Sequence, residues 1–202
     1  MDNRSRRAPR RPSGCSSFGA RHAGDESGDQ TFDLVRWEVV AGAGIRLSEI
    51  AADHERPEPG LREQSFGRVD GMKVDDIKAR HPGAWEGWLR FEEHYAMPGG
   101  ESAHQFHKRV MEAVHRLVAA HRGGKLVIVT HGGVLDMIYR TARSLGLNGP
   151  RQSEIPNAGL NRVRMRDGGI DILDWADTQH LADLPPQPVY DQKALVSRPR
   201  AA

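Results

Sequence analysis

Apolar positions with a helical period predict one long helix in the middle of the chain. Between residues 106 and 118 they follow one another at intervals of 4, 1, 3, 3 and 1, which places them on one side of a helix. Ser102 and Gln105 form a capping-box pair just before this stretch, so the helix is expected to begin at Ser102. The glycine pair at 123–124 is expected to end it.

After this helix the pattern becomes strand-like. Residues 125–130 (KLVIVT) are a short β-branched apolar run, typical of a strand covered on both faces. A helix over 134–145 follows directly, and two alternating segments, 160–165 and 170–175, flank the turn residues 167–169 of a predicted hairpin. Helix, strand, helix and hairpin in this order predict an α/β domain with a partly parallel sheet.

Weaker patterns precede the long helix. Residues 32–35 indicate a short strand, and residues 45–52 are compatible with a helix. Residues 74–80 predict a helix that Pro82 stops, and the aromatic positions between 85 and 91 predict another.

The two ends of the chain differ in composition from its middle. Residues 1–30 are rich in Arg, Pro, Ser and Gly without any helical or strand period, so we expect a basic, poorly ordered extension there. Residues 177–202 are expected to form a Pro-rich tail. A chain of 202 residues favours one folded domain, which we place at 31–176.

The net charge of +2 is unevenly distributed. Residues 1–11 carry a net charge of +4 and the rest of the chain −2, so the body lacks the basic face that nucleic-acid binding needs. The alternative is nucleic-acid binding by the arginine tail, which would show a steep salt dependence.

No apolar run reaches 18 residues, so we expect no membrane partner. The single cysteine, Cys15, favours a reducing compartment, and we expect the cytoplasm.

The segment VIVTHGG (127–133) is the strongest local signal of chemistry. His131 follows a buried strand and precedes a helix, and ligands of open α/β sheets bind at the carboxyl ends of strands. Gly132 and Gly133 let the backbone approach a ligand, and the start of the helix offers free N–H donors to an anion. We therefore expect a phosphate at the junction of strand and helix formed by residues 131–133, which we call the corner, and we expect His131 to donate a hydrogen bond to it. The alternative is a histidine that only completes a turn.

A second signal is LREQSFGRVDG (61–71). Glu63 lies there between an apolar residue and a predicted turn at Phe66-Gly67. A carboxylic acid near a bound phosphate can protonate the leaving oxygen, which is general acid catalysis. The alternative is a solvated loop glutamate.

Four segments taken together resemble the histidine phosphatase superfamily, in its phosphoglycerate mutase-like branch. They are LREQSFGRVDG (61–71), PGGESAHQFHKRV (98–110), VIVTHGG (127–133) and IPNAGLNRV (155–163). The resemblance implies a three-layer α/β/α sandwich with a mostly parallel sheet. It also implies metal-independent phosphoryl chemistry on a small phosphomonoester through a phosphohistidine, with no cofactor. Glu63 takes the position of the proton donor and acceptor, and His131 that of the second, phosphate-contacting histidine. The sequence leaves a homodimer open.

The resemblance also implies an arginine that grips phosphate at the end of a Ser-Asp-Leu-x-Arg segment. Residues 32–36 (FDLVR) match this segment in part, so Arg36 is the candidate for substrate binding together with Gly132. The residues after Arg36 depart from the family pattern, and Arg46 is a rival.

The nucleophile is missing from its expected place. In the family it is a histidine in an Arg-His-Gly triplet that ends the first strand, and the chain contains no such triplet. The pair Arg21-His22 is a candidate substitute for this triplet, but two observations speak against it. The residues before it do not have the pattern of a strand, and only 13 residues separate it from Arg36, which are too few for a βαβ unit. We therefore expect the first strand to be absent, as in a truncated or frame-shifted gene product.

Two hypotheses about function follow from these observations. One is a phosphatase or phosphoryl-transfer enzyme, and the other is a catalytically impaired relic that keeps the phosphate pocket without the nucleophile. A metal-dependent hydrolase is a third reading, which rests on His104 and His107 at i and i+3 of the long helix. No Asp, Glu or His set with recognised spacing accompanies them, so solvated helix histidines are expected instead.

Overall fold

The computed structural model describes residues 30–36, 56–122, 125–166, 169–186 and 192. The predicted N-terminal extension (1–29), the helix at 45–52 and most of the C-terminal tail lie outside the described residues. The helices and strands are β1 (Gln30–Arg36), α1 (Val74–Arg80), α2 (Pro82–Trp88), α3 (Ala103–Ala120), β2 (Lys125–Thr130), α4 (Gly132–Ala142), β3 (Leu160–Arg166) and β4 (Gly169–Asp177). Short 3-10 turns lie at Pro59–Leu61, Gly67–Val69 and Gln179–Leu181.

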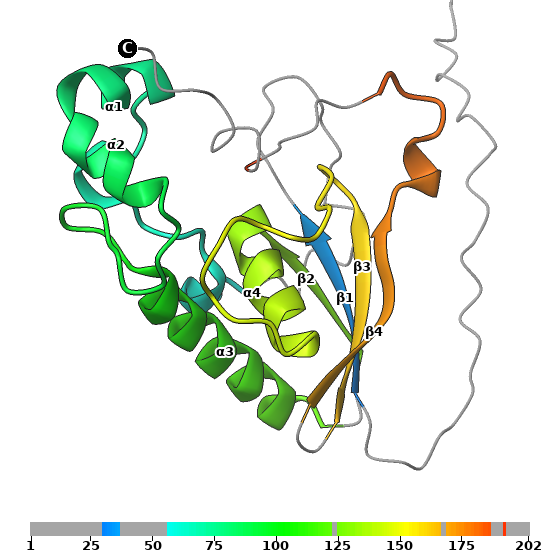
Figure 1. Ribbon diagram of the computed structural model, residues 1–202. Coiled ribbons are helices and arrows are strands. Elements are labelled where there is room, and N and C mark those ends of the chain that lie inside the picture. The colour runs from blue at the N-terminus through cyan, green and yellow to red at the C-terminus, as the bar shows by residue number, and fades with distance from the viewer. Residues whose placement is uncertain (1–29, 37–55, 123–124, 167–168, 187–191, 193–202) are drawn as a thin grey trace, which may run out of the picture.

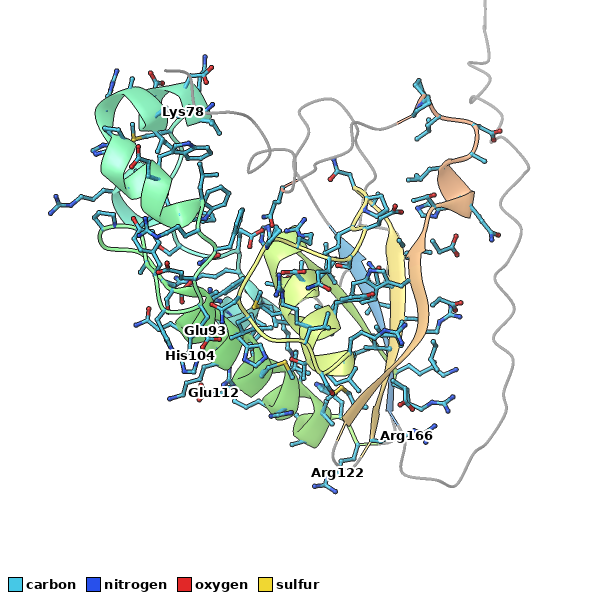
Figure 2. The ribbon with its side chains drawn as sticks, in the orientation of Figure 1. Lys78, Glu93, His104, Glu112, Arg122 and Arg166 are labelled. Carbon is cyan, nitrogen blue, oxygen red and sulfur yellow. The ribbon has the colours of Figure 1, made fainter. Side chains whose placement is uncertain are left out.

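The long helix α3 begins where its capping box places it. The Gln105 amide donates to the Ser102 hydroxyl at 3.2 Å, and the Ser102 amide donates to the Gln105 side chain at 2.9 Å. The helix ends with His121 as its C-cap, before the glycine pair at 123–124. Its outer face is polar, and Glu112 points away from the sheet (Figure 2). The strand over 125–130 and the helix over 74–80 also have their predicted bounds.

The four described strands form one mixed sheet in the order β2-β1-β3-β4. β1 is parallel to β2, with Thr31 opposite Lys125 and Arg36 opposite Thr130, and it is antiparallel to β3. β3 and β4 form the predicted hairpin. The α/β class is thus confirmed, and the strand indicated at 32–35 is present as β1. The three-layer sandwich with a mostly parallel sheet stays a prediction.

The helices α3 and α4 pack on one face of this sheet (Figure 1) and enclose the main core. Phe106 and Val110 of α3 and Leu135 of α4 are fully buried there. The prediction that residues 125–130 are covered on both faces is wrong, because Val127 is 52% exposed. β2 ends the described sheet, and the core reaches only the alternate side chains Leu126 and Ile128.

A second, smaller cluster lies under α1 and α2. Its buried members are Val69, Ile77 and Met97, with Trp85 and Trp88 packed against them. Glu93 and His104 lie side by side between this region and the start of α3 (Figure 2), where the His104 amide donates to the Glu93 carbonyl at 2.9 Å. Within the described residues, no helix has both the length and the apolar character that a membrane span requires.

Candidate phosphate-binding corner

His131 stands between β2 and α4, as the sequence predicts. It is the N-cap of α4 and is half-buried, and Gly132 and Gly133 begin the helix behind it. The residue before it, Thr130, is buried, and its hydroxyl donates to the Leu61 carbonyl at 2.7 Å. This bond joins the end of β2 to the loop that carries Glu63, although the two are 69 positions apart.

Glu63 lies directly against the start of α4. Its Oε2 accepts a hydrogen bond from the Gly133 amide at 3.1 Å, and its Oε1 accepts one from the Gln64 amide at 2.9 Å. The Gly133 amide belongs to the first turn of α4, whose N–H groups have no partner within the helix. A Cβ at residue 133 would clash with Glu63 Oε1, so glycine permits this approach. The two segments that the sequence singled out therefore meet at one corner.

Arg109 of α3 holds the Glu63 loop in place. Its guanidinium binds Glu101 through Nε and Nη2, both at 2.7 Å. The remaining N–H groups donate to the carbonyls of Gly60, Arg62 and Glu63 at 2.9 to 3.3 Å. All five donors of the guanidinium are thus engaged, three of them by the backbone next to the candidate acid.

Glu101 extends this clamp to the other side of the loop. Its Oε2 accepts from the Ser65 amide at 3.1 Å, its amide donates to the Ser65 carbonyl at 2.8 Å, and its carbonyl accepts from the Gln64 side chain at 2.8 Å. The hydrogen bond from Arg109 is the main cause that lowers the pKa of Glu101 below its usual value. The backbone of residues 60–65 is therefore fixed from both sides.

Arg36 reaches the same edge of the sheet through its backbone. It is the last residue of β1 and lies opposite Thr130 in the parallel register. Because the carboxyl ends of parallel strands meet at one edge, Arg36 is placed next to the segment that holds His131. Arg46 and His22 lie outside the described residues.

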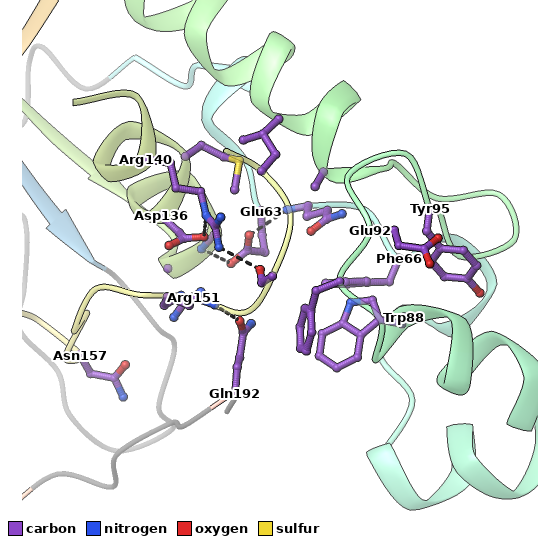
Figure 3. Close-up of a pocket in the computed structure, with 18 residues that line it drawn as sticks. Glu63, Phe66, Trp88, Glu92, Tyr95, Asp136, Arg140, Arg151, Asn157 and Gln192 are labelled. Carbon is purple, nitrogen blue, oxygen red and sulfur yellow. Dashed lines mark hydrogen bonds and ion pairs between the residues drawn. The ribbon is translucent and has the colours of Figure 1, made fainter. Parts of the chain in front are cut away.

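A pocket of about 520 Å³ opens beside this corner (Figure 3). Glu63, Gly132 and Gly133 line one part of it, and Phe66, Trp88 and Phe91 line another. His131 precedes the two lining glycines in α4 and is not itself among the lining residues. Asp136 and Arg140 lie on the helical wall next to Glu63 (Figure 3). The corner thus connects to a cavity large enough for a small organic molecule.

Asp136 and Arg140 form a buried ion pair that no pattern in the sequence predicts. Nε of Arg140 donates to Asp136 Oδ2 at 2.8 Å, and their side chains are 3% and 9% exposed. The other donors of Arg140 bind four loop carbonyls, those of Gly146, Asn148, Gly149 and Pro150. The i, i+4 spacing of an acid and an arginine is visible in the sequence, but it is equally common on exposed helices.

The two histidines considered as metal ligands have other surroundings. His107 is half-buried and pairs with the Thr141 hydroxyl of α4 at 2.8 Å, while His104 is exposed and its ring lies 5.0 Å from that of His94. Burial is the main cause that lowers the pKa of His107, and His104 lowers it further. In the described part of the chain, no three His, Cys, Asp or Glu side chains are grouped so as to hold a metal ion.

Comparison with known families gives a match over most of the described chain. The model of the histidine phosphatase superfamily (branch 1) matches residues 47–178. The metal-independent phosphoserine phosphatase of Arabidopsis thaliana is 31% identical over 127 residues, which are 62% of this chain and 52% of that protein. Phosphoglycerate mutase-like protein 4 of the same plant is 30% identical over 148 residues, or 72% of this chain and 60% of that protein. The chain therefore spans between half and two thirds of each relative.

Solved structures show the same fold. Bacillus stearothermophilus YhfR aligns with a TM-score of 0.61 at 20% identity and covers 75% of this chain and 99% of its own. The mycobacterial glucosyl-3-phosphoglycerate phosphatase aligns with a TM-score of 0.52 at 25% identity, over 61% of this chain and 65% of its own.

Proposed function

Because the chain belongs to the histidine phosphatase superfamily (branch 1), we propose that it binds a phosphomonoester at the corner of His131, Gly132 and Glu63 and hydrolyses it without a metal. The observation that carries this proposal is the 3.1 Å bond from the Gly133 amide to Glu63. It joins a carboxylic acid to the amino end of the helix that His131 caps, and a carboxylic acid and a helix start are groups that phosphoryl transfer uses.

Each residue has a defined role in this proposal. The imidazole of His131 and the N–H groups of the first turn of α4 donate to the phosphate oxygens and offset their charge. Arg36, at the end of the neighbouring strand, supplies a guanidinium to the same anion. Glu63 in its protonated form gives a proton to the leaving oxygen as the P–O bond breaks.

In the phosphohistidine route, an imidazole nitrogen attacks phosphorus while the ester P–O bond breaks, and Glu63 protonates the alcohol that leaves. Water then attacks the phosphohistidine, Glu63 takes a proton from it, and phosphate departs with the free imidazole restored. The nucleophile of this route is a second histidine besides His131, and His22 is the candidate that the sequence offers.

A second candidate function is phosphate-ester binding without turnover, and one observation favours it. The chain contains no Arg-His-Gly triplet, and the residue that follows Arg36 at the end of β1 is Trp37 and not histidine. A chain without the nucleophile would lose about 10⁴ to 10⁶ in rate and still bind phosphate.

The experiment that separates these functions uses 4-nitrophenyl phosphate with a chelator present, together with titration by inorganic phosphate. The variants are His131→Asn and, as a matched control, His115→Asn on the exposed face of α3. Turnover that is lost in His131→Asn and kept in the control supports the phosphatase. Phosphate binding without turnover, again lost only in His131→Asn, supports the binding protein. The absence of both turnover and binding would refute both functions.

A further inference from the structure

We propose that the pocket beside the corner selects phosphomonoesters whose organic group is an uncharged aromatic ring, and disfavours those that carry a second anionic group. This inference rests on the proposed function, since it assumes that the phosphate occupies the corner at Gly132 and Gly133. The pocket continues past that corner to the side chains of α2 and its flanking loops (Figure 3).

The far wall of the pocket is aromatic. Trp88 lies at its centre, with the ring of Phe91 5.0 Å away and the ring of Phe66 6.4 Å away and nearly edge-on. We call these three residues the aromatic wall. Rings at these separations and angles gain from their mutual quadrupole interaction, and a further ring on the ligand extends the same arrangement.

Side chains outside the pocket support the aromatic wall. Trp88 stacks on Trp85 at 5.3 Å, and both pack against the buried cluster of Val69, Ile77 and Met97. Trp85 does not line the pocket, so it supports Trp88 without touching a ligand there. A wall fixed in this way loses little side-chain entropy when a flat ligand binds to it.

The buried arginine on the pocket offers nothing to a second anion. Two arginines are among the lining residues of the described chain, and no lysine is. All five N–H donors of Arg140 are bound to Asp136 and to loop carbonyls. A carboxylate on the ligand would therefore lose its hydration next to Arg140 without gaining an ionic partner from it.

The lining acids are compatible with this preference. Asp136 is paired with Arg140 at 2.8 Å, and the exposed Glu92 is paired with Arg90 at 3.0 Å. Neither pair presents a net positive charge to a second anionic group on the ligand, and a neutral ring needs none.

The test uses two phosphonates, which cannot be hydrolysed and so report binding whether or not the protein turns over. Benzylphosphonate presents a phenyl ring, and 3-phosphonopropionate presents a carboxylate at a comparable distance. We expect calorimetric titration to give benzylphosphonate a dissociation constant at least about tenfold lower than that of 3-phosphonopropionate, the factor that one aromatic contact and the desolvation of the carboxylate supply. Equal affinities, or tighter binding of 3-phosphonopropionate, would overturn the inference.

Variants of Trp88 test whether the aromatic wall causes the preference. Trp88→Ala should weaken the binding of benzylphosphonate more than that of 3-phosphonopropionate and so reduce the preference severalfold, while Trp88→Phe should keep most of it. Trp175→Ala on β4 is the matched control, because Trp175 packs on Tyr139 at 5.0 Å and does not line the pocket. Retention of the full preference in Trp88→Ala would refute the role of the aromatic wall. If Trp88→Ala does not fold, Trp88→Leu answers the same question.

The two proposals fail in different ways. If inorganic phosphate binds and His131→Asn abolishes that binding, the corner is established, and only the ligand preference is at stake. If inorganic phosphate does not bind at all, the proposed function itself is refuted.

Discussion

Replacement of Arg109 by glutamine tests how the Glu63 loop is held. The guanidinium makes five hydrogen bonds, two to the carboxylate of Glu101 and three to the carbonyls of Gly60, Arg62 and Glu63. Glutamine is too short to reach most of these acceptors. The carboxylate of Glu101, only 19% exposed, would be left without its cation.

The expected loss of stability follows from this burial. Removing one partner of a fully buried pair costs about 3–5 kcal/mol, and an exposed pair contributes about 0–1 kcal/mol. The side chains of Arg109 and Glu101 are 20% and 19% exposed, so we expect Arg109→Gln to lower the free energy of unfolding by about 2–4 kcal/mol.

Urea denaturation is the assay, with a double-mutant cycle that includes Glu101→Gln. The cycle should show a favourable coupling between the two side chains of at least about 1 kcal/mol. Arg116→Gln is the matched control, because Arg116 also joins α3 to this region through Glu58 but is 59% exposed, and its loss should cost less than about 1 kcal/mol. A loss in Arg109→Gln no larger than in the control would refute the clamp.

Three further predictions concern the corner, a histidine and the second arginine. Gly133→Ala places a methyl group against Glu63 Oε1 and 3.0 Å from the buried ring of Phe106, and this methyl group obstructs the approach of a ligand to the first N–H groups of α4. Titration should therefore show weaker phosphate binding, and unchanged binding would contradict the proposed site. Burial lowers the pKa of His107 below 6.5 in the folded protein, so the unfolded chain takes up this proton first, and the free energy of unfolding should fall as the pH drops below about 6.5. In urea denaturation between pH 7 and 5, His107→Gln should make the unfolding free energy less dependent on pH. An identical slope in the variant and the unaltered chain would contradict the lowered pKa of His107. Arg140→Met should lower the free energy of unfolding by about 3–5 kcal/mol, because the Arg140 side chain is only 3% exposed and leaves Asp136 without its cation. The control Arg166→Met breaks a half-exposed pair with Asp171 and should cost less than about 1 kcal/mol. Equal losses in the two variants would show that the burial of the Arg140–Asp136 pair is unimportant.

Local signals in the sequence predicted the elements around the corner well. The capping box of Ser102 and Gln105 depends on residues three positions apart, so it fixes the start of α3 without reference to the rest of the fold. The β-branched run at 125–130 likewise defines β2 by its own composition. The resemblance to the superfamily is confirmed by the family match over 47–178.

Contacts between distant segments could not be predicted in the same way. The burial of β2 on one face alone depends on which elements pack on each face of the sheet, and the run KLVIVT carries no information about that. Arg109 lies within a segment that resembles the family, but its role appears only when α3 brings it under the loop of Glu63, 46 positions earlier. Arg140 is similar, since its four carbonyl partners belong to a loop without any local pattern.

Titration with orthovanadate, a phosphate analogue, shows whether the start of α4 binds an oxyanion. We expect saturable binding to the unaltered chain, and a loss of at least about tenfold in affinity in both His131→Asn and Gly133→Ala, since the first removes a donor and the second places a methyl group at the same site. His115→Asn should bind as the unaltered chain does. Vanadate binding that neither change at the corner weakens would contradict the assignment of this corner as the phosphate site.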